Sequence, residues 1–120
     1  MHPRLHPLEQ LHQLDDALRL SALRPLVLFK HSRTCGTSAQ ALDELLEHLD
    51  QSTADAHYAM VTVQTHREIS TLIAQRLGVR HETPQVLLLR DGRVVWHASH
   101  FRVTAAAIAA ALESQAAAVR

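Results

Sequence analysis

Two short apolar runs separated by a helical stripe constrain the fold of this chain most strongly. Leu26 to Phe29 and Tyr58 to Val63 lack the alternation of a strand with one solvated face, so each is predicted to be a strand buried on both faces of a sheet. Between them, apolar residues recur at helical spacing at Ala39, Leu42, Leu45, Leu46 and Leu49. A strand–helix–strand unit of this kind predicts parallel strands joined by a right-handed crossover.

Two further helical stripes flank these strands. Leucines three and four residues apart predict a helix from Pro7 to Leu20, with one face formed by Leu8, Leu11, Leu14 and Leu18. A second helix is expected after Val63, with Thr65 as its N-cap and Glu68 as the partner in a capping box. Gly78 is a suitable residue to end it.

The C-terminal third predicts a hairpin and a last helix. Gln85 to Leu89 is expected to be a third strand, and Asp91-Gly92 is a strong signal for the tight turn that leads into a fourth strand, Arg93 to Ala98. Thr104 is expected to cap an alanine-rich final helix. The order therefore predicts one α/β domain over residues 1–120, with a mixed four-stranded central sheet flanked by about four helices on both faces.

Charge and hydropathy exclude several function classes. Twelve Lys and Arg balance twelve Asp and Glu, so we expect neither nucleic acid nor an anionic membrane as a partner. No segment approaches the ~20 apolar residues of a membrane span. The first residues lack the layout of a signal peptide, which makes a cytoplasmic location the expectation.

Cys35 is the single cysteine of the chain, so an intramolecular disulfide is excluded and any disulfide partner must come from another molecule. It falls where a buried strand gives way to a helix, and the unpaired N–H groups at a helix start stabilise a thiolate. Lys30, His31 and Arg33 act in the same direction, and no acidic residue is near Cys35 in the sequence until Asp43. We therefore predict a reactive thiol with a lowered pKa rather than a cysteine that only fills space.

The segment Cys35-Gly36-Thr37-Ser38 has the spacing of a Cys-x-x-Cys redox pair in which an oxygen replaces the second sulfur. Ser38 therefore cannot resolve a mixed disulfide. Two roles remain open for its hydroxyl: donating a hydrogen bond to the Cys35 thiolate, or capping the helix.

Three blocks of this sequence, in this order, resemble the YtxJ family of monothiol bacilliredoxins over roughly residues 7 to 112. The blocks are Phe29-Lys30-His31-Ser32 with Thr34-Cys35, Leu77-Gly78-Val79 with His81-Glu82 and Pro84-Gln85-Val86, and Asp91-Gly92 with Trp96-His97-Ala98-Ser99-His100. The resemblance implies a thioredoxin-like three-layer fold. The family often has a proline after its cysteine, where this chain has Gly36.

The resemblance also implies an activity, namely removal of bacillithiol from S-bacillithiolated client proteins by transfer onto Cys35. It implies bacillithiol as a thiol co-substrate and no bound metal or prosthetic group. Thioredoxin-like folds place a cis proline opposite the active cysteine, and Pro84 after Thr83 matches that position. Such a bond would expose the Thr83 backbone to an incoming substrate strand.

Histidines near these blocks are further candidates. His31 is expected to tune Cys35, and His81 to act as a thiolate partner or to bind a carboxylate of the small thiol, with weaker expectations for His97 and His100. A zinc site built from His31, Cys35, His81 and His97 is not expected, because no close-set ligand pair is present.

Two other functions stay open at this point. Cys35-Gly36-Thr37-Ser38 is similar to the Cys-Gly-Phe-Ser motif of monothiol glutaredoxins, which bind an iron–sulfur cluster, although the Phe is missing. A non-catalytic thioredoxin-fold binding module, in which Cys35 is only passively modified, is the second alternative.

Overall fold

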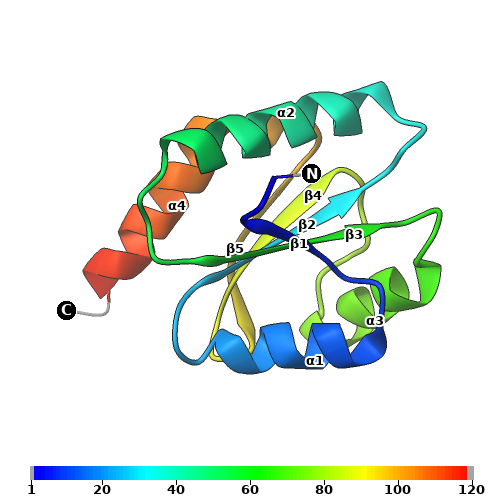
Figure 1. The fold of residues 1–120 in the computed structure, drawn as a ribbon, viewed down its shortest axis with the longest axis horizontal. Helices are drawn as coiled ribbons and strands as arrows, with labels where there is room; N and C mark the ends of the chain where they lie inside the picture. The colour runs from blue at the N-terminus through cyan, green and yellow to red at the C-terminus, as the bar shows by residue number, and fades with distance from the viewer. Residues whose placement is uncertain (1, 119–120) are drawn as a thin grey trace.

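The computed structural model describes residues 2–118 and places one sheet between two pairs of helices (Figure 1). No helix in this range is long and apolar enough to cross a membrane. In chain order the elements are β1 (Leu5–Pro7), α1 (Leu11–Leu20), β2 (Leu26–His31), α2 (Gly36–Gln51), β3 (His57–Thr62), α3 (Arg67–Leu77), β4 (Gln85–Arg90), β5 (Arg93–Ser99), the 3₁₀ helix η1 (His100–Arg102) and α4 (Ala105–Ala118).

The sheet is mixed and has the order β1-β3-β2-β4-β5. β2 runs parallel to β3, as the crossover through α2 predicts, while β4 is antiparallel to both β2 and β5. The α/β class, the mixed sheet and the four helices are confirmed. The sheet has five strands rather than the four predicted.

The additional strand is β1, which adds to the edge of the sheet in parallel with β3. The helix predicted from Pro7 begins instead at Leu11, because Pro7 is the last residue of β1 and an edge strand tolerates a residue without an N–H. Leu8 and Leu14 are buried, but Leu11 is 43% exposed, so the predicted four-leucine face is interrupted.

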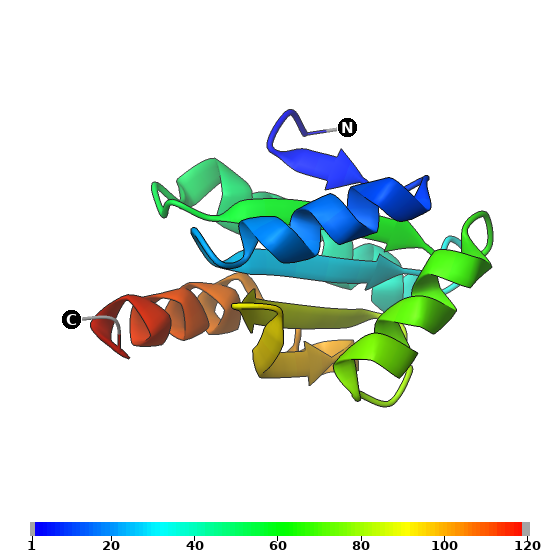
Figure 2. The ribbon, with the colours of Figure 1, turned by 90° about the horizontal axis from the view of Figure 1, so that it is seen from below.

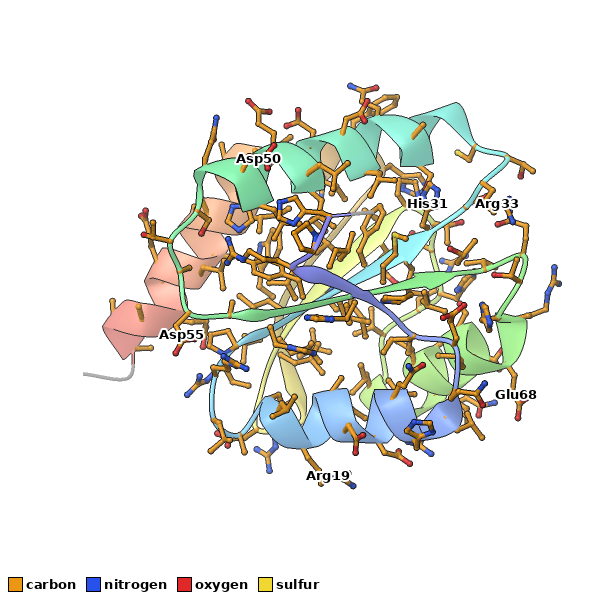
Figure 3. The ribbon with its side chains drawn as sticks, in the orientation of Figure 1. Arg19, His31, Arg33, Asp50, Asp55 and Glu68 are labelled. Carbon is orange, nitrogen blue, oxygen red and sulfur yellow. The ribbon has the colours of Figure 1, made fainter. Side chains whose placement is uncertain are left out.

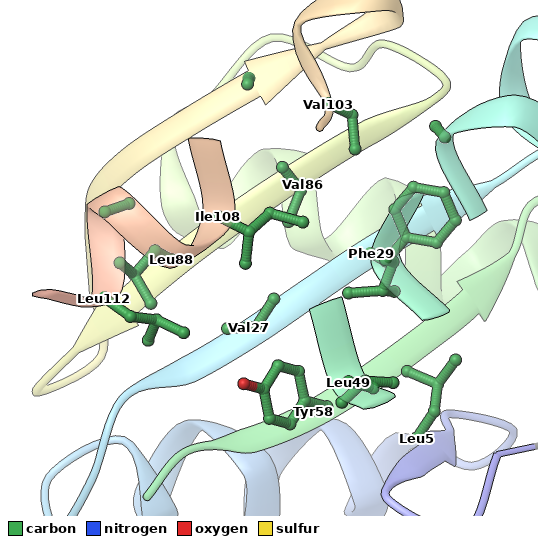
Figure 4. Close-up of a cluster of buried hydrophobic side chains, with 14 residues drawn as sticks. Leu5, Val27, Phe29, Leu49, Tyr58, Val86, Leu88, Val103, Ile108 and Leu112 are labelled. Atoms are coloured by element: carbon green, nitrogen blue, oxygen red, sulfur yellow. The ribbon is translucent and has the colours of Figure 1, made fainter. Parts of the chain in front are cut away.

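Alternate side chains of the central strands supply two separate hydrophobic cores. Val27 and Phe29 of β2 pack with α2 and α4, where Figure 4 shows Phe29 with Val86 and Ile108. Leu26 and Leu28 point to the other face, which α1 and α3 cover (Figure 2). Because β2 has apolar side chains on both faces, helices cover the sheet on both sides and the fold has three layers.

The hairpin turn, the end of α3 and the cap of α4 lie where the sequence predicts them. Asp91 and Gly92 both have positive φ, 52° and 73°, as a tight type I′ hairpin requires, and Gly78 ends α3 with φ 68°. Thr104 Oγ1 accepts a hydrogen bond from the N–H of Ala107 at 3.1 Å. The predicted cap of α3 is wrong, because its N-cap is His66 and no side chain caps it.

Candidate functional site

Cys35 is the N-cap of α2, at the carboxyl end of the central strand β2. Its backbone is extended and its side chain is partly exposed, so the sulfur is reachable from solvent. In Figure 3, His31 and Arg33 mark the turn that carries the chain from β2 toward α2. The predicted placement of the thiol between a buried strand and a helix is therefore confirmed.

The pKa of the Cys35 thiol lies below its ordinary value, chiefly because the backbone N–H of Ser38 stabilises the thiolate. Burial opposes this lowering of the pKa, and the backbone N–H and hydroxyl of Thr37 support it. The cause differs in part from the prediction, because the pKa is lowered by groups in the first turn of α2 and not by Lys30, His31 or Arg33.

We expect alkylation of Cys35 by iodoacetamide to show a midpoint below the pKa of about 8.5 of a free cysteine. Thr37→Val removes the hydroxyl that supports the thiolate and should move the midpoint upward. The backbone amides remain in this variant, so its midpoint should still lie below that of a model cysteine peptide. A wild-type midpoint above pH 8.5 would contradict the assignment.

Ser38 takes neither of the roles considered for its hydroxyl. The residue is fully buried, and its Oγ accepts a hydrogen bond from the N–H of Ser32 at 2.9 Å. The same Oγ lies 2.8 Å from Nδ1 of His31, in a second hydrogen bond. The Ser38 side chain therefore ties α2 to the end of β2, and only its backbone acts on the thiolate.

His31 is held from two sides. Its ring stacks on Phe29, with a centroid separation of 5.9 Å, while its Nδ1 bonds Ser38. Burial, and secondly the charge of Arg33, lower the pKa of His31, which favours a neutral ring near pH 7. A neutral His31 stabilises the loop by packing and hydrogen bonding, rather than stabilising the thiolate by a positive charge.

Gln64 is a site residue that the sequence reasoning missed. Its Nε2 donates to Ser32 Oγ at 2.7 Å and to Thr34 Oγ1 at 3.2 Å, and its Oε1 accepts from the N–H of Arg33 at 3.0 Å. One side chain thus holds three consecutive residues before Cys35. A usable signal was present, because Gln64 follows β3 and the carboxyl ends of parallel strands meet at one edge of a sheet.

Gly36 is the first residue of α2, and a larger side chain would fit at this position. A Cβ added to it would meet nothing within 4 Å, and its φ is not in the left-handed region. The first helical position also suits proline, whose missing N–H would be unpaired there in any case. The departure from the family's proline at this position therefore leaves the geometry of the loop intact.

The peptide bond between Thr83 and Pro84 is cis, as predicted. It directly precedes β4, whose first residue, Gln85, pairs with Lys30 near the end of β2. The carbonyl of Pro84 accepts a hydrogen bond from the N–H of His100 at 2.9 Å. The register therefore places this loop at the same end of the sheet as Cys35.

The other candidate histidines, His81, His97 and His100, interact with groups other than the Cys35 thiol. His81 Nδ1 lies 3.4 Å from Ser70 Oγ of α3. The pKa of Glu82 is lowered first by a hydrogen bond from the Ser99 hydroxyl and further by charges that include His100 and His97. Within residues 2–118, no three His, Cys, Asp or Glu side chains are placed to hold a metal ion.

Lys30 lies on the wrong face to tune Cys35. Because side chains alternate along β2, Lys30 shares the α1/α3 face with Leu28, while His31 faces α2. Lys30 is fully buried. The predicted electrostatic role of Lys30 toward the thiol is therefore wrong.

A small cavity of about 170 Å³ lies between α2 and η1, and Thr37, two residues after Cys35, is one of its lining residues. Its lining includes Thr37, Gln40, His100 and the strongly exposed Phe101. A larger groove of about 710 Å³ lies between α2 and α4, and Glu44 lines both this groove and the small cavity. The lining of the small cavity comes closer to Cys35 along α2 than the lining of the groove does.

The fold and a lone thiol at a helix start define a thioredoxin-fold thiol redox protein. A solved thioredoxin-fold protein described as a candidate oxidoreductase is similar to this chain, with 28% identity, a TM-score of 0.80 and coverage of 90% of this chain and 93% of the other.

Two thioredoxins show the same fold. A thioredoxin from Fasciola hepatica has 16% identity and a TM-score of 0.72, and the match covers 91% of this chain and 97% of the other. A thioredoxin variant from Halobacterium salinarum has 19% identity and a TM-score of 0.71, and the match covers 92% of this chain and 89% of the other. The family model described as monothiol bacilliredoxin BrxC matches residues 6–108, so the chain belongs to the monothiol bacilliredoxin family.

Proposed function

We propose that this protein removes bacillithiol from S-bacillithiolated client proteins by transferring it onto Cys35. The observation that carries the proposal is a single, partly exposed cysteine at the N-cap of α2, with amides of the first helical turn lowering its pKa. Family membership over residues 6–108 supports bacillithiol as the small thiol.

The exchange proceeds in two balanced steps. The Cys35 thiolate attacks the bacillithiol sulfur of the mixed disulfide, a new S–S bond forms between them, and the client cysteine leaves as a thiolate. Because the chain has no second cysteine, the loaded Cys35 is released by a thiol from another molecule. That thiol attacks the new disulfide, and Cys35 leaves as a thiolate. No metal or prosthetic group takes part.

The small cavity is the proposed place for the part of bacillithiol that follows its sulfur. Thr37 supports this placement, because it lines the cavity and its hydroxyl also lowers the pKa of the Cys35 thiol. His100, in its lining, has a ring nitrogen that could donate a hydrogen bond to a carboxylate of the small thiol.

The test uses a client protein that carries one bacillithiol–cysteine mixed disulfide. It is mixed with this protein in the absence of any other thiol, and both chains are followed by intact mass. We expect bacillithiol to leave the client and to appear on this chain in equal amount. Cys35→Ser is nearly isosteric with the wild type and should abolish both changes.

A parallel reaction uses the same client carrying glutathione. Transfer of glutathione without transfer of bacillithiol would show exchange chemistry with a different small thiol. Transfer of neither would overturn the proposal and favour a binding module. An absorbance band near 400–450 nm in anaerobically purified protein would favour an iron–sulfur carrier instead.

A further inference from the structure

The two helices that cover one face of the sheet, α2 and α4, carry negative charge only. α2 has four acidic residues and α4 has one, and neither helix contains a Lys or an Arg. The chain as a whole is balanced, with twelve Lys and Arg against twelve Asp and Glu. The positive charges therefore lie on other elements, and these two helices form an acidic side of the molecule.

Helix stability does not explain where the acidic residues of α2 lie. None is in the first turn, where the helix dipole favours negative charge; the four are Asp43, Glu44, Glu47 and Asp50. Two of them have structural partners, because Glu44 Oε1 accepts a hydrogen bond from the N–H of Ala105 at 3.0 Å and Asp50 lies 3.1 Å from His2 Nε2. Glu47 is exposed and has no such partner within residues 2–118.

Glu47 shares the α2/α4 groove of about 710 Å³ with two other carboxylates, those of Glu44 and Glu113. This volume is in the range of ligand-binding sites, which is about 300–1,000 Å³. The wall from α4 is mostly alanine, so a ligand can approach this helix closely. Among the described residues, no Lys or Arg lines the groove and no ion pair includes any of its three carboxylates.

The basic groups closest to the groove do not neutralise it. His48 lines the groove but is 3% exposed, and its Nε2 is hydrogen-bonded to the Tyr58 hydroxyl at 2.8 Å. Burial, and secondly the charge of Arg4, lower the pKa of His48, which favours a neutral ring near pH 7. The Arg4 guanidinium lies over the Tyr58 ring and donates to three backbone carbonyls around the end of α2. The charge that complements this groove is therefore a cation from another molecule.

The groove meets the small cavity at Glu44, which lines both. Together the two hollows follow α2 from Thr37, two residues after the thiol, to Gln51 at the end of the helix, where Figure 1 shows α4 beside α2. At 1.5 Å per residue, Glu47 lies about 18 Å along α2 from Cys35. An extended chain spans this distance in about five or six residues.

We propose that the α2/α4 groove binds a basic segment of the client protein, with a Lys or Arg about five or six residues from the client's modified cysteine. The inference rests on the proposed function and deepens it, because it names the class of client that reacts fastest. Glu47 and Glu113 attract the cationic group of the client. The alanines of α4 pack against the aliphatic part of its side chain.

The test measures exchange rate constants for peptides that each carry one cysteine in a mixed disulfide with bacillithiol or glutathione. Two basic peptides have a Lys-Arg pair about five residues before or after the cysteine, and matched peptides have Gln or Glu there. At low ionic strength, we expect one basic peptide to react about tenfold faster than its Gln counterpart and the Glu peptide to react slowest. This preference should disappear at about 1 M salt, where the Debye length is about 3 Å.

Variants of the exposed residues test whether the preference arises in the groove. Combining Glu47→Gln with Glu113→Gln should reduce the ratio of basic to Gln peptide rates to about one, and Glu47→Lys should favour the Glu peptide. Glu9→Gln removes one carboxylate before α1, on the opposite side of the sheet, and should keep the full ratio.

A second pair of variants tests the shape of the groove without changing its charge. Ala106 and Ala110 are both exposed on α4, but only Ala106 lines the groove. Ala106→Trp should therefore lower the basic-to-Gln ratio, and Ala110→Trp should not. Thermal midpoints and iodoacetamide alkylation rates of all variants identify any that are misfolded.

Equal rates for the basic and Gln peptides in the wild type would overturn the inference, as would a ratio that survives in the double Gln variant. A ratio that falls equally in Glu9→Gln would also overturn it, because the preference would then not arise in the groove. A dimer that the double Gln variant loses, with no preference for basic peptides, would assign the groove to a second copy of this chain and overturn it too. Failure of the wild type with every peptide would instead reject the proposed function itself.

Discussion

Replacing Phe29 with alanine is expected to lower the free energy of unfolding by about 3–5 kcal/mol. Phe29 is fully buried in the core between the sheet and helices α2 and α4, so the change leaves a large cavity (Figure 4). A domain of this size has a stability of only about 5–15 kcal/mol, so the loss removes a large share of it. Urea unfolding followed by circular dichroism measures the change.

The chain provides a matched control for this experiment. Phe101 of η1 is 73% exposed, so Phe101→Ala removes the same atoms without opening a cavity. We expect this control to change the free energy of unfolding by no more than about 0.5 kcal/mol. Equal losses in the two variants would show that Phe29 is not the core residue described.

Replacing Ser38 with alanine is expected to cost about 1–3 kcal/mol, the penalty for leaving a buried donor unpaired. Ser38 Oγ accepts the N–H of the buried Ser32 and also bonds His31, and the variant removes both hydrogen bonds. The turn between β2 and Cys35 then loses the two hydrogen bonds that join it to the Ser38 side chain of α2. Urea unfolding again provides the measurement.

Ser114, on an exposed position of α4, is the control for this variant. Ser114→Ala should leave stability unchanged or raise it slightly, because alanine is the better helix former. If Ser38→Ala is as stable as Ser114→Ala, the Ser38 hydroxyl does not supply the buried hydrogen bonds.

Periodicity and turn chemistry predicted the elements that carry the site. Continuous apolar runs identified β2 and β3, and Asp91-Gly92 identified the hairpin, because these signals depend only on neighbours along the chain. The same signals placed Cys35 at the start of a helix. They failed at β1, since three residues are too few to show a period, and its pairing with β3 is a tertiary contact.

The contacts of the site could not be predicted in this way. Gln64 bonds residues about thirty positions earlier in the chain, and this contact depends on β2 and β3 ending at the same edge. The sequence suggested that the Ser38 hydroxyl bonds the thiolate or caps the helix. It bonds His31 and Ser32 instead, because the turn between β2 and α2 brings these residues next to it.

The sequence by itself determined the α/β layering, the hairpin and the position of the single thiol at a helix start, since each is encoded by residues close together in the chain. Only the tertiary structure decided which groups act on that thiol. Lys30 and His31 are consecutive, yet the pleat of β2 sends Lys30 to the face that α1 and α3 cover and His31 toward α2. The face that a side chain occupies depends on packing on both sides of the sheet, which distance along the chain does not reveal.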